Sequence, residues 1–253
     1  MKPPHLQIRA ATDVGLRRSH NEDHHGWWMA DGQPGDEEIA VLVVADGMGG
    51  ANAGEVASQI AVYCVLEGCR EHGRSVALKD LAAAVEKANH TVYEQGLEQP
   101  DQRGMGTTCT ALLVRGSQAW QAHVGDSRIY LLRDGMLKQL TRDHSLVAQL
   151  VEGNHLTPEQ ARQDPRRNVV TRCLGAGPTV DVDLAEIEGG IVPGDTFLLC
   201  TDGLHGVVDD REIQMLGSEK DLGKACYRSI DLARDRGGPD NITVIVMRAG
   251  GAR

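Results

Sequence analysis

The stretch from residue 107 to residue 140 holds several apolar runs in close succession, with only short polar connections between them. The runs cover residues 107–114, 118–124, 128–132 and 137–140. The connections are Arg115-Gly116-Ser117, Gly125-Asp126-Ser127 and Arg133-Asp134-Gly135. Parallel neighbours need a crossover of about a dozen residues or more, so connections this short favour antiparallel pairing. We therefore expect an antiparallel sheet here and interpret all three connections as tight hairpin turns.

Helices are expected on both sides of this stretch, because residues 53–69 and 78–93 carry apolar side chains at helical spacing. Another helix is expected near residues 220–236. Further strands are expected at residues 7–12, 25–29, 39–45, 180–187, 196–200 and 242–247. Hairpins together with helices in separate blocks favour the α+β class, with helical layers covering the sheet faces. The expected architecture is a β-sandwich flanked by helices.

The composition is that of an ordinary globular chain, with 253 residues of which 41% are hydrophobic and 25% are charged. A net charge of −10 disfavours nucleic acid as a partner, because binding to its phosphates needs clustered Lys and Arg. No secretory signal is evident at the start, and no apolar run approaches the ~18 residues of a membrane span. We expect a free-standing cytoplasmic domain that does not bind membranes.

Acidic residues stand at the beginning or end of several apolar runs. They are Asp46, Asp126, Asp202, Asp240 and the pair Glu22-Asp23. Carboxylates that meet in the fold disfavour each other's ionisation unless a cation neutralises them. Ligands that are all oxygen favour Mg²⁺ or Mn²⁺, and this number of carboxylates favours two ions over one. The carbonyl of Gly47 is a further oxygen ligand beside Asp46. The sequence therefore indicates a metal-dependent hydrolase.

Each motif taken alone also has a simpler interpretation. Asp46-Gly47 after a strand is a common turn, and Arg17-Arg18 is commonly a solvated turn rather than a phosphate clamp. A dinucleotide-binding loop after Gly47 is disfavoured, since Asn52 stands where that motif requires glycine. The histidines near Glu22-Asp23 lack a zinc-binding spacing. Only the combination of acidic positions carries the metal hypothesis.

Several short segments, taken in order, resemble the metal-dependent Ser/Thr protein phosphatases of the 2C type in their compact bacterial form. They are Arg18-x-x-Asn21-Glu22-Asp23, Val43-Val44-Ala45-Asp46-Gly47-Met48-Gly49-Gly50, Gly106-Thr107-Thr108, Val124-Gly125-Asp126-Ser127-Arg128, Thr201-Asp202-Gly203 and Asp240-Asn241. The resemblance covers about residues 9–247, almost the whole chain. It implies one phosphatase catalytic domain over residues 1–253, in which two antiparallel sheets form a sandwich between helix pairs.

The resemblance also implies roles for the acidic residues. Asp46 resembles the carboxylate that bridges two Mn²⁺ or Mg²⁺ ions and is expected to be catalytic. Asp202 and Asp240 would complete the shell of one ion. The Gly47 carbonyl would serve the other ion. The choice between Mn²⁺ and Mg²⁺ stays open.

Further roles follow from the same resemblance. Asp23 would serve the second ion directly or through water, with Glu22 as the competing candidate. Asp126 resembles the ligand of a third, weaker metal site. Arg18 resembles the catalytic arginine that binds the phosphate. Residues 143–172 correspond to a mobile flap that shapes substrate access.

The implied reaction is hydrolysis of phosphoserine and phosphothreonine by a hydroxide that bridges the two ions. The implied partners are phosphorylated proteins and a cognate bacterial Ser/Thr kinase, and the protein is expected to be a monomer. Met48 stands where many eukaryotic members have a histidine proposed as general acid, so the general acid stays open. Asp164-Pro165 replaces a common His-Pro in the flap. The rival hypotheses are an inactive module that binds phosphorylated proteins and a phosphatase restricted to a few signalling proteins.

Overall fold

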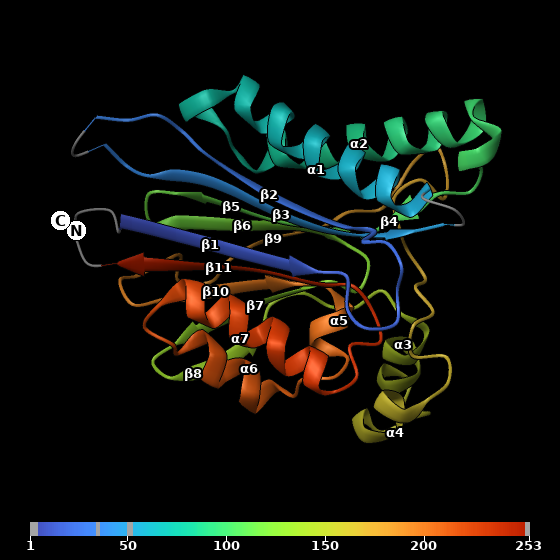
Figure 1. The fold of residues 1–253 in the computed structure, drawn as a ribbon. Helices are drawn as coiled ribbons and strands as arrows, with labels where there is room; N and C mark the ends of the chain where they lie inside the picture. Colours follow the sequence, from blue (N-terminus) through green and yellow to red (C-terminus); the bar gives the residue numbers. More distant parts are fainter. Residues whose placement is uncertain (1–4, 34–35, 50–52, 251–253) are drawn as a thin grey trace.

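Two antiparallel sheets face each other at the centre of the computed structural model, which describes residues 5–33, 36–49 and 53–250 (Figure 1). The strand order of the first sheet is β1 (His5–Asp13), β11 (Ile242–Gly250), β10 (Thr196–Cys200), β7 (Arg128–Arg133) and β8 (Met136–Gln139). The order of the second is β2 (Asp23–Met29), β3 (Ile39–Met48), β5 (Cys109–Arg115), β6 (Gln118–Val124) and β9 (Asp183–Glu186), with the short β4 (Gly106–Thr107) paired to β3.

Helices cover the outer face of each sheet (Figure 1). The long α1 (Ala53–Glu71) and α2 (Leu78–Glu98) lie over the second sheet, and α6 (Asp210–Gly217) and α7 (Leu222–Asp235) lie over the first. The short α5 (Asp202–His205), α3 (Leu146–Glu152) and α4 (Pro158–Gln163) lie toward one end of the sandwich. The 3₁₀ turns η1 (Gly73–Ser75) and η2 (Pro100–Gln102) flank α2. These layers confirm the predicted α+β sandwich between helix pairs.

The strand β3 explains why the central strands read as unbroken apolar runs. Val41 and Val43 pack against α1 and α2, whereas Ala40, Leu42 and Val44 face the other sheet. All five side chains are fully buried, because successive residues of a strand point to opposite faces and both faces are covered. Burying each Val or Leu contributes about 1.5–3 kcal/mol. Packing from two sides therefore holds β3 rigidly as it approaches Asp46.

The connection Gly125-Asp126-Ser127 is not a hairpin, and that prediction is wrong. Strand β6 belongs to the second sheet and β7 to the first, so the chain crosses between the sheets here. Gly125 has a φ of 115°, and a Cβ at this position would lie 2.5 Å from Thr108 Cγ2. The other two connections are hairpins as predicted, since β5 pairs with β6 and β7 with β8. Strands β6 and β7 are both buried on both faces, so the apolar pattern alone could not distinguish pairing from crossing.

The strand β3 also extends further than predicted. It continues through Asp46 and Gly47 to Met48, because its last two residues pair with β4. Asp46 thus lies inside a strand rather than after its end. Gly50, the last residue of that glycine-rich motif, lies outside the described residues.

Two other elements differ from the sequence-based expectation. Strand β9 is shorter than the strand predicted at residues 180–187. Helix α6 was not predicted, although Asp209 caps it by accepting a hydrogen bond from the backbone N–H of Glu212. In the part of the chain that the structure describes, no helix is long and apolar enough to cross a membrane.

Candidate active site

Five of the predicted metal ligands line one small cavity at an end of the sandwich. The cavity has a volume of about 220 Å³, and its lining includes Asp46, Gly47, Asp126, Asp202 and Asp240. They come from β3, from the crossing between β6 and β7, from the start of α5 and from the loop before β11. The lining also includes Arg18, Glu22, Met48, Thr108, Asn168 and Asn241. Segments far apart in the sequence therefore meet here, as the metal hypothesis requires.

The backbone around Asp46 is held in place by two threonines. The Asp46 N–H donates to Thr108 Oγ1 at 2.8 Å, and the Asp46 carbonyl accepts from Thr108 N at 2.9 Å and from Thr107 Oγ1 at 2.9 Å. A Cβ on Gly47 would lie 2.0 Å from the carbonyl oxygen of Gly54, so only glycine fits there. No role was predicted for these threonines from the sequence. Their place in the motif Gly106-Thr107-Thr108 was the signal that could have indicated one.

Asp23 is buried next to Asp46, directly opposite it across the β2–β3 pair. Its Oδ2 accepts a hydrogen bond from Thr201 Oγ1 at 2.8 Å. Within the described residues, Asp23 Oδ1 and Asp202 Oδ1 are buried without any hydrogen-bond partner. Buried polar atoms are normally paired, and an unpaired carboxylate oxygen costs free energy. These two atoms therefore point to a ligand that would satisfy them.

The pKa values of Asp23, Asp46, Asp126 and Asp202 are shifted upward. Burial, and then the charge of neighbouring carboxylates, raises the pKa of Asp126 to about 8 and that of Asp202 to about 6. Burial also raises the pKa of Asp23 to about 7, and the pKa of Asp46 lies well above its usual range. Each upward shift means that the cations of the chain do not fully compensate the ionised form. A bound cation would reverse that penalty.

The donor set fits hard divalent ions. Among the described residues, no three His, Cys, Asp or Glu side chains already enclose a single ion position. The carboxylates instead surround a cavity. Mg²⁺ usually keeps several waters and takes only one or two carboxylates directly, and carboxylate, carbonyl and water oxygens also suit Mn²⁺. The residues present therefore fit such ions in charge and in ligand type.

Arg18 lies at the edge of this cavity. Its Nη2 donates to Asp240 Oδ2 at 2.7 Å, and 49% of its side chain is exposed. A guanidinium has five N–H donors, so this one bond leaves others for a phosphoryl group. Asn241 holds the loop that carries Arg18, since its Nδ2 donates to the carbonyls of Val14 and His20, each at 2.9 Å. Glu22, the alternative to Asp23 as a ligand of the second ion, lines the cavity.

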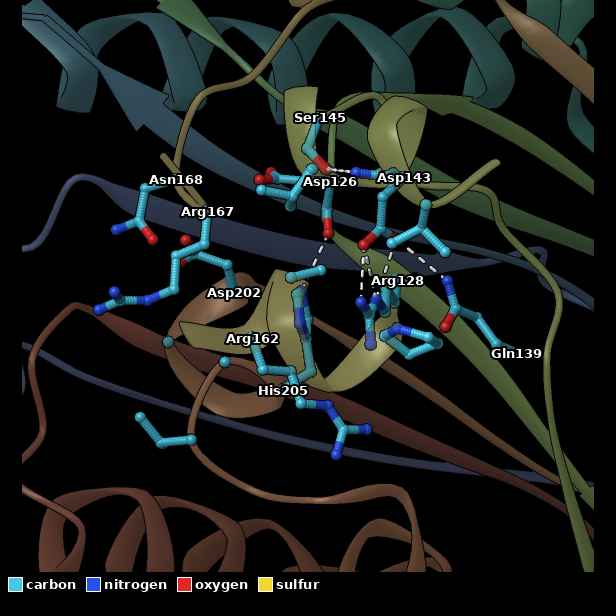
Figure 2. Close-up of a pocket in the computed structure, with 18 of the residues that line it drawn as sticks. Asp126, Arg128, Gln139, Asp143, Ser145, Arg162, Arg167, Asn168, Asp202 and His205 are labelled. Atoms are coloured by element: carbon cyan, nitrogen blue, oxygen red, sulfur yellow. Dashed lines mark hydrogen bonds and ion pairs between the residues drawn. The ribbon is translucent and has the colours of Figure 1, made fainter. Parts of the chain in front are cut away.

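A larger groove of about 800 Å³ continues from the cavity (Figure 2). The two share Arg18, Asp126, Asn168, Asp202 and Asp240. Helices α3 and α4, which belong to the predicted flap at residues 143–172, form one side of the groove. The segment from α5 to the start of α6 forms another side.

His205 is a site residue that sequence reasoning missed. Its Nε2 donates to the carbonyl of Asp126 at 2.9 Å, which helps to hold the chain where it crosses between the sheets. Burial, and then the charge of Arg128, lowers the pKa of His205 to about 3, so the ring is neutral at physiological pH. No pattern marked this residue, because α5 was not predicted.

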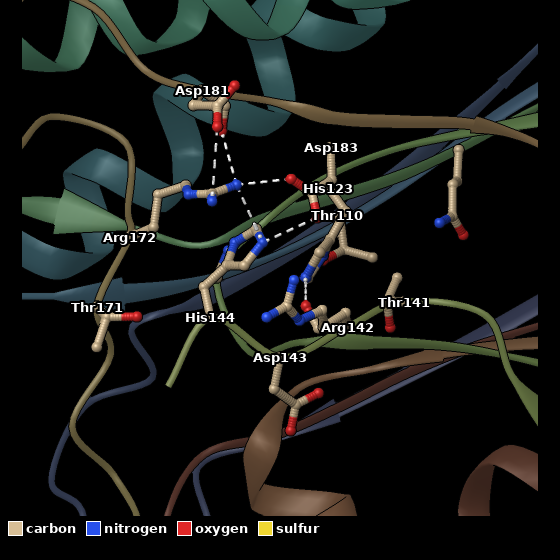
Figure 3. Close-up of polar contacts among 12 residues, drawn as sticks. Thr110, His123, Thr141, Arg142, Asp143, His144, Thr171, Arg172, Asp181 and Asp183 are labelled. Carbon is tan, nitrogen blue, oxygen red and sulfur yellow. Dashed lines mark hydrogen bonds and ion pairs between the residues drawn. The ribbon is translucent and has the colours of Figure 1, made fainter. Parts of the chain in front are cut away.

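The two ends of the flap meet at a polar cluster that we call the flap base, made of His144, Arg172 and Asp183 (Figure 3). Asp183 accepts hydrogen bonds from Arg172 Nη1 at 2.6 Å and from His144 Nε2 at 3.1 Å. His144 Nδ1 accepts from the N–H of Gly125 at 3.0 Å, and the His144 N–H donates to the Gly125 carbonyl at 2.7 Å. The flap base is therefore tied to the residue that precedes Asp126.

Comparison with known proteins identifies the family. The family model described as protein phosphatase 2C matches residues 17–242. The Ser/Thr protein phosphatase PstP of Mycobacterium tuberculosis is 39% identical over 241 residues, which is 95% of this chain but only 44% of that protein. The Ser/Thr phosphatase stp of Listeria monocytogenes is 37% identical over 249 residues, 96% of this chain and 95% of that protein. This chain thus spans less than half the length of PstP and nearly all of stp.

Solved structures agree with this assignment. The crystal structure of M. tuberculosis PstP has a TM-score of 0.84 at 37% identity and covers 97% of this chain and 99% of that one. The catalytic domain of PstP in complex with two manganese ions has a TM-score of 0.82 at 36% identity, with 97% and 99% covered. The predicted fold class is confirmed. The chain belongs to the protein phosphatase 2C family.

Proposed function

We propose that this protein is a metal-dependent phosphatase that removes phosphate from phosphoserine and phosphothreonine in proteins. The observation that carries the proposal is the group of buried carboxylates whose charge the nearby arginines do not balance, because the pKa of each stays raised. Membership of a family whose cited relatives are named Ser/Thr phosphatases supports the choice of reaction. The PstP domain with two manganese ions supports Mn²⁺ or Mg²⁺ as the cofactor, with two ions in the site.

The cavity residues would have different roles in binding the two ions. Asp46 would hold both ions, Asp202 and Asp240 would complete the shell of one, and the Gly47 carbonyl would serve the other. Asp23 lies beside Asp46 and would contact an ion directly or through water. Two ions held by these residues would supply a water of lowered pKa and would offset charge on the phosphoryl oxygens.

Other residues would position the substrate. Arg18 would donate parallel hydrogen bonds to two phosphoryl oxygens while Asp240 keeps its guanidinium in place. Asp126 would hold the third, weaker ion. Met48 lines the cavity but its thioether carries no proton, so the leaving oxygen would take its proton from solvent in the site. The flap at residues 143–172 would close one side of the substrate groove.

The remaining expectations stay predictions. They are a cognate Ser/Thr kinase as functional partner, a monomeric state, a cytoplasmic location, and one catalytic domain over residues 1–253.

Turnover of a phosphothreonine peptide with Mn²⁺, with and without EDTA, tests the proposal. We expect phosphate release that needs the metal and that EDTA abolishes. Hydrolysis that is insensitive to EDTA would refute the metal mechanism. Tight binding of the phosphopeptide without any release of phosphate would instead support an inactive binding module.

A further inference from the structure

The groove beside the cavity offers a path for the polypeptide that carries the phosphoresidue. A phosphoryl group bound beside Arg18 in the cavity would leave its peptide backbone outside, and the groove shares Arg18 and other lining residues with the cavity. Apolar side chains of α3 and α4, among them Val147, Val151 and Ala161, line one wall. Such a wall suits the side chains of an extended segment.

Most of the arginines along the groove are already neutralised. Arg18 pairs with Asp240 at 2.7 Å, and Arg128 pairs with Asp143 at 2.6 Å. Arg142 pairs with Glu152. Within the residues that the structure describes, the groove arginines that have no carboxylate at ion-pair distance are Arg162 and Arg167.

These two arginines differ in their relation to the metal cavity. Arg167 is close enough to Asp202 to lower the pKa of that carboxyl, which places it at the metal end of the groove. Arg162 is exposed and stands in the last turn of α4. A capping box fixes the start of this short helix, since Gln160 N donates to Thr157 Oγ1 at 3.2 Å and Thr157 N to Gln160 Oε1 at 2.8 Å. Arg162 is therefore a cation presented by a defined element.

The groove is also asymmetric in charge. Asp210, at the start of α6, lines it as well, and its side chain accepts a hydrogen bond from the hydroxyl of Tyr130 at 3.5 Å. An acidic group near Asp210 would be repelled, whereas one near Arg162 would be attracted. This difference would orient an acidic peptide along the groove.

We propose that the groove binds the segment flanking the phosphoresidue, and that Arg162 selects substrates with an acidic side chain at a fixed distance from it. The inference rests on the proposed phosphatase function and narrows its substrate class to acidic phosphoprotein segments. A guanidinium recognises a carboxylate or a second phosphate through two parallel hydrogen bonds. Because Arg162 is exposed, the selectivity is modest and falls at high salt.

A peptide series tests this directly. Phosphothreonine peptides with an alanine background carry one glutamate, moved from about six residues before the phosphoresidue to about six after it, a reach of about 20 Å on each side at ~3.3–3.6 Å per residue. We expect kcat/KM of the wild-type protein with Mn²⁺ to rise about two- to fivefold when the glutamate occupies one position or two neighbouring ones.

Variants assign the effect to one side chain. R162Q should remove the preference, and R162E should replace it with a preference for lysine at the same position. The matched control is R166Q, because Arg166 lies on the same flap, pairs with Asp164 at 2.9 Å and does not line the groove. R166Q should keep the wild-type profile, and every variant should hydrolyse p-nitrophenyl phosphate as the wild type does.

The outcomes separate the two proposals. Metal-dependent turnover of p-nitrophenyl phosphate with a flat glutamate profile would overturn the role of Arg162 and leave the phosphatase function standing. A glutamate preference that survives in R162Q would also overturn it. Absence of any metal-dependent turnover in the wild type would remove the proposed function, and this inference with it.

Discussion

Acidic side chains gather both in the metal-candidate cavity and at the flap base, and the chain balances their charge differently. At the flap base, burial would raise the pKa of Asp183, but hydrogen bonds from Arg172 and His144 lower it below its usual range. In the cavity, burial and neighbouring carboxylates raise the pKa of Asp46 and Asp126 with no comparable compensation. At the flap base, side chains of the protein itself balance the acidic charge. In the cavity, as we propose, a bound cation would balance it.

The comparison predicts opposite effects from removing one charge in each place. The largest effect is expected at the centre of the cavity, in Asp46→Asn. Activity should fall on the order of 10³-fold, because the carboxylate that we propose holds both ions is lost. The metal-free protein should become more stable by about 1–3 kcal/mol, since the substitution relieves a buried, uncompensated charge. Phosphopeptide kinetics and thermal unfolding in EDTA measure the two effects.

Asp231→Asn on the exposed side of α7 serves as the control and should change neither quantity. If Asp46→Asn instead destabilised the metal-free protein, the cavity would resemble the flap base and the comparison would fail.

The stability of the metal-free protein should fall as pH rises. The pKa is raised to about 6 for Asp202, about 7 for Asp23 and about 8 for Asp126 in the folded protein, against ~3.9 in an unfolded chain. The folded state therefore binds more protons than the unfolded state between about pH 4 and pH 8, so raising the pH destabilises it. The loss should be on the order of a few kcal/mol.

Mn²⁺ should abolish this trend, because the bound ion takes the place of the protons. Thermal unfolding at several pH values, in EDTA and in Mn²⁺, checks the prediction. A metal-free protein that gained stability from pH 5 to pH 8 would show that the carboxyls are already compensated.

A smaller effect of opposite sign is expected at the flap base. Asp183→Asn removes the ion pair with Arg172, whose side chain is 32% exposed, so the loss of stability should be only about 0.5–1 kcal/mol. Loosening the flap should raise KM for phosphopeptides about two- to fivefold and leave hydrolysis of p-nitrophenyl phosphate unchanged. Asp181→Asn is the matched control, since Asp181 lies 3.6 Å from the same arginine but is 86% exposed. It should shift stability by less than about 0.5 kcal/mol.

The sandwich could be predicted from the sequence, because the spacing of apolar residues indicates which faces of a strand or helix are buried. The sequence placed β3 well, since alternate side chains of this strand enter two different clusters. It missed the crossing at Gly125, because that depends on which sheet the next strand joins, a long-range choice. It missed α5 and α6 because both are short, with four and eight residues.

The candidate site was predictable in part for a similar reason. Acidic residues beside apolar runs indicated Asp46, Asp126, Asp202 and Asp240, which line one cavity. The burial of Asp23 away from that lining depends on strand register, which the sequence alone did not fix. The roles of His205 and the flap base also depend on contacts between distant segments.

Calorimetric titration of the metal-free protein with Mn²⁺ in two buffers of different ionisation enthalpy is the most direct test of the central claim. The account predicts about two ions bound per chain at pH 6.5, with release of protons from the cavity carboxyls, and loss of that binding in Asp46→Asn. Absence of saturable binding, or binding that Asp46→Asn leaves unchanged, would contradict it.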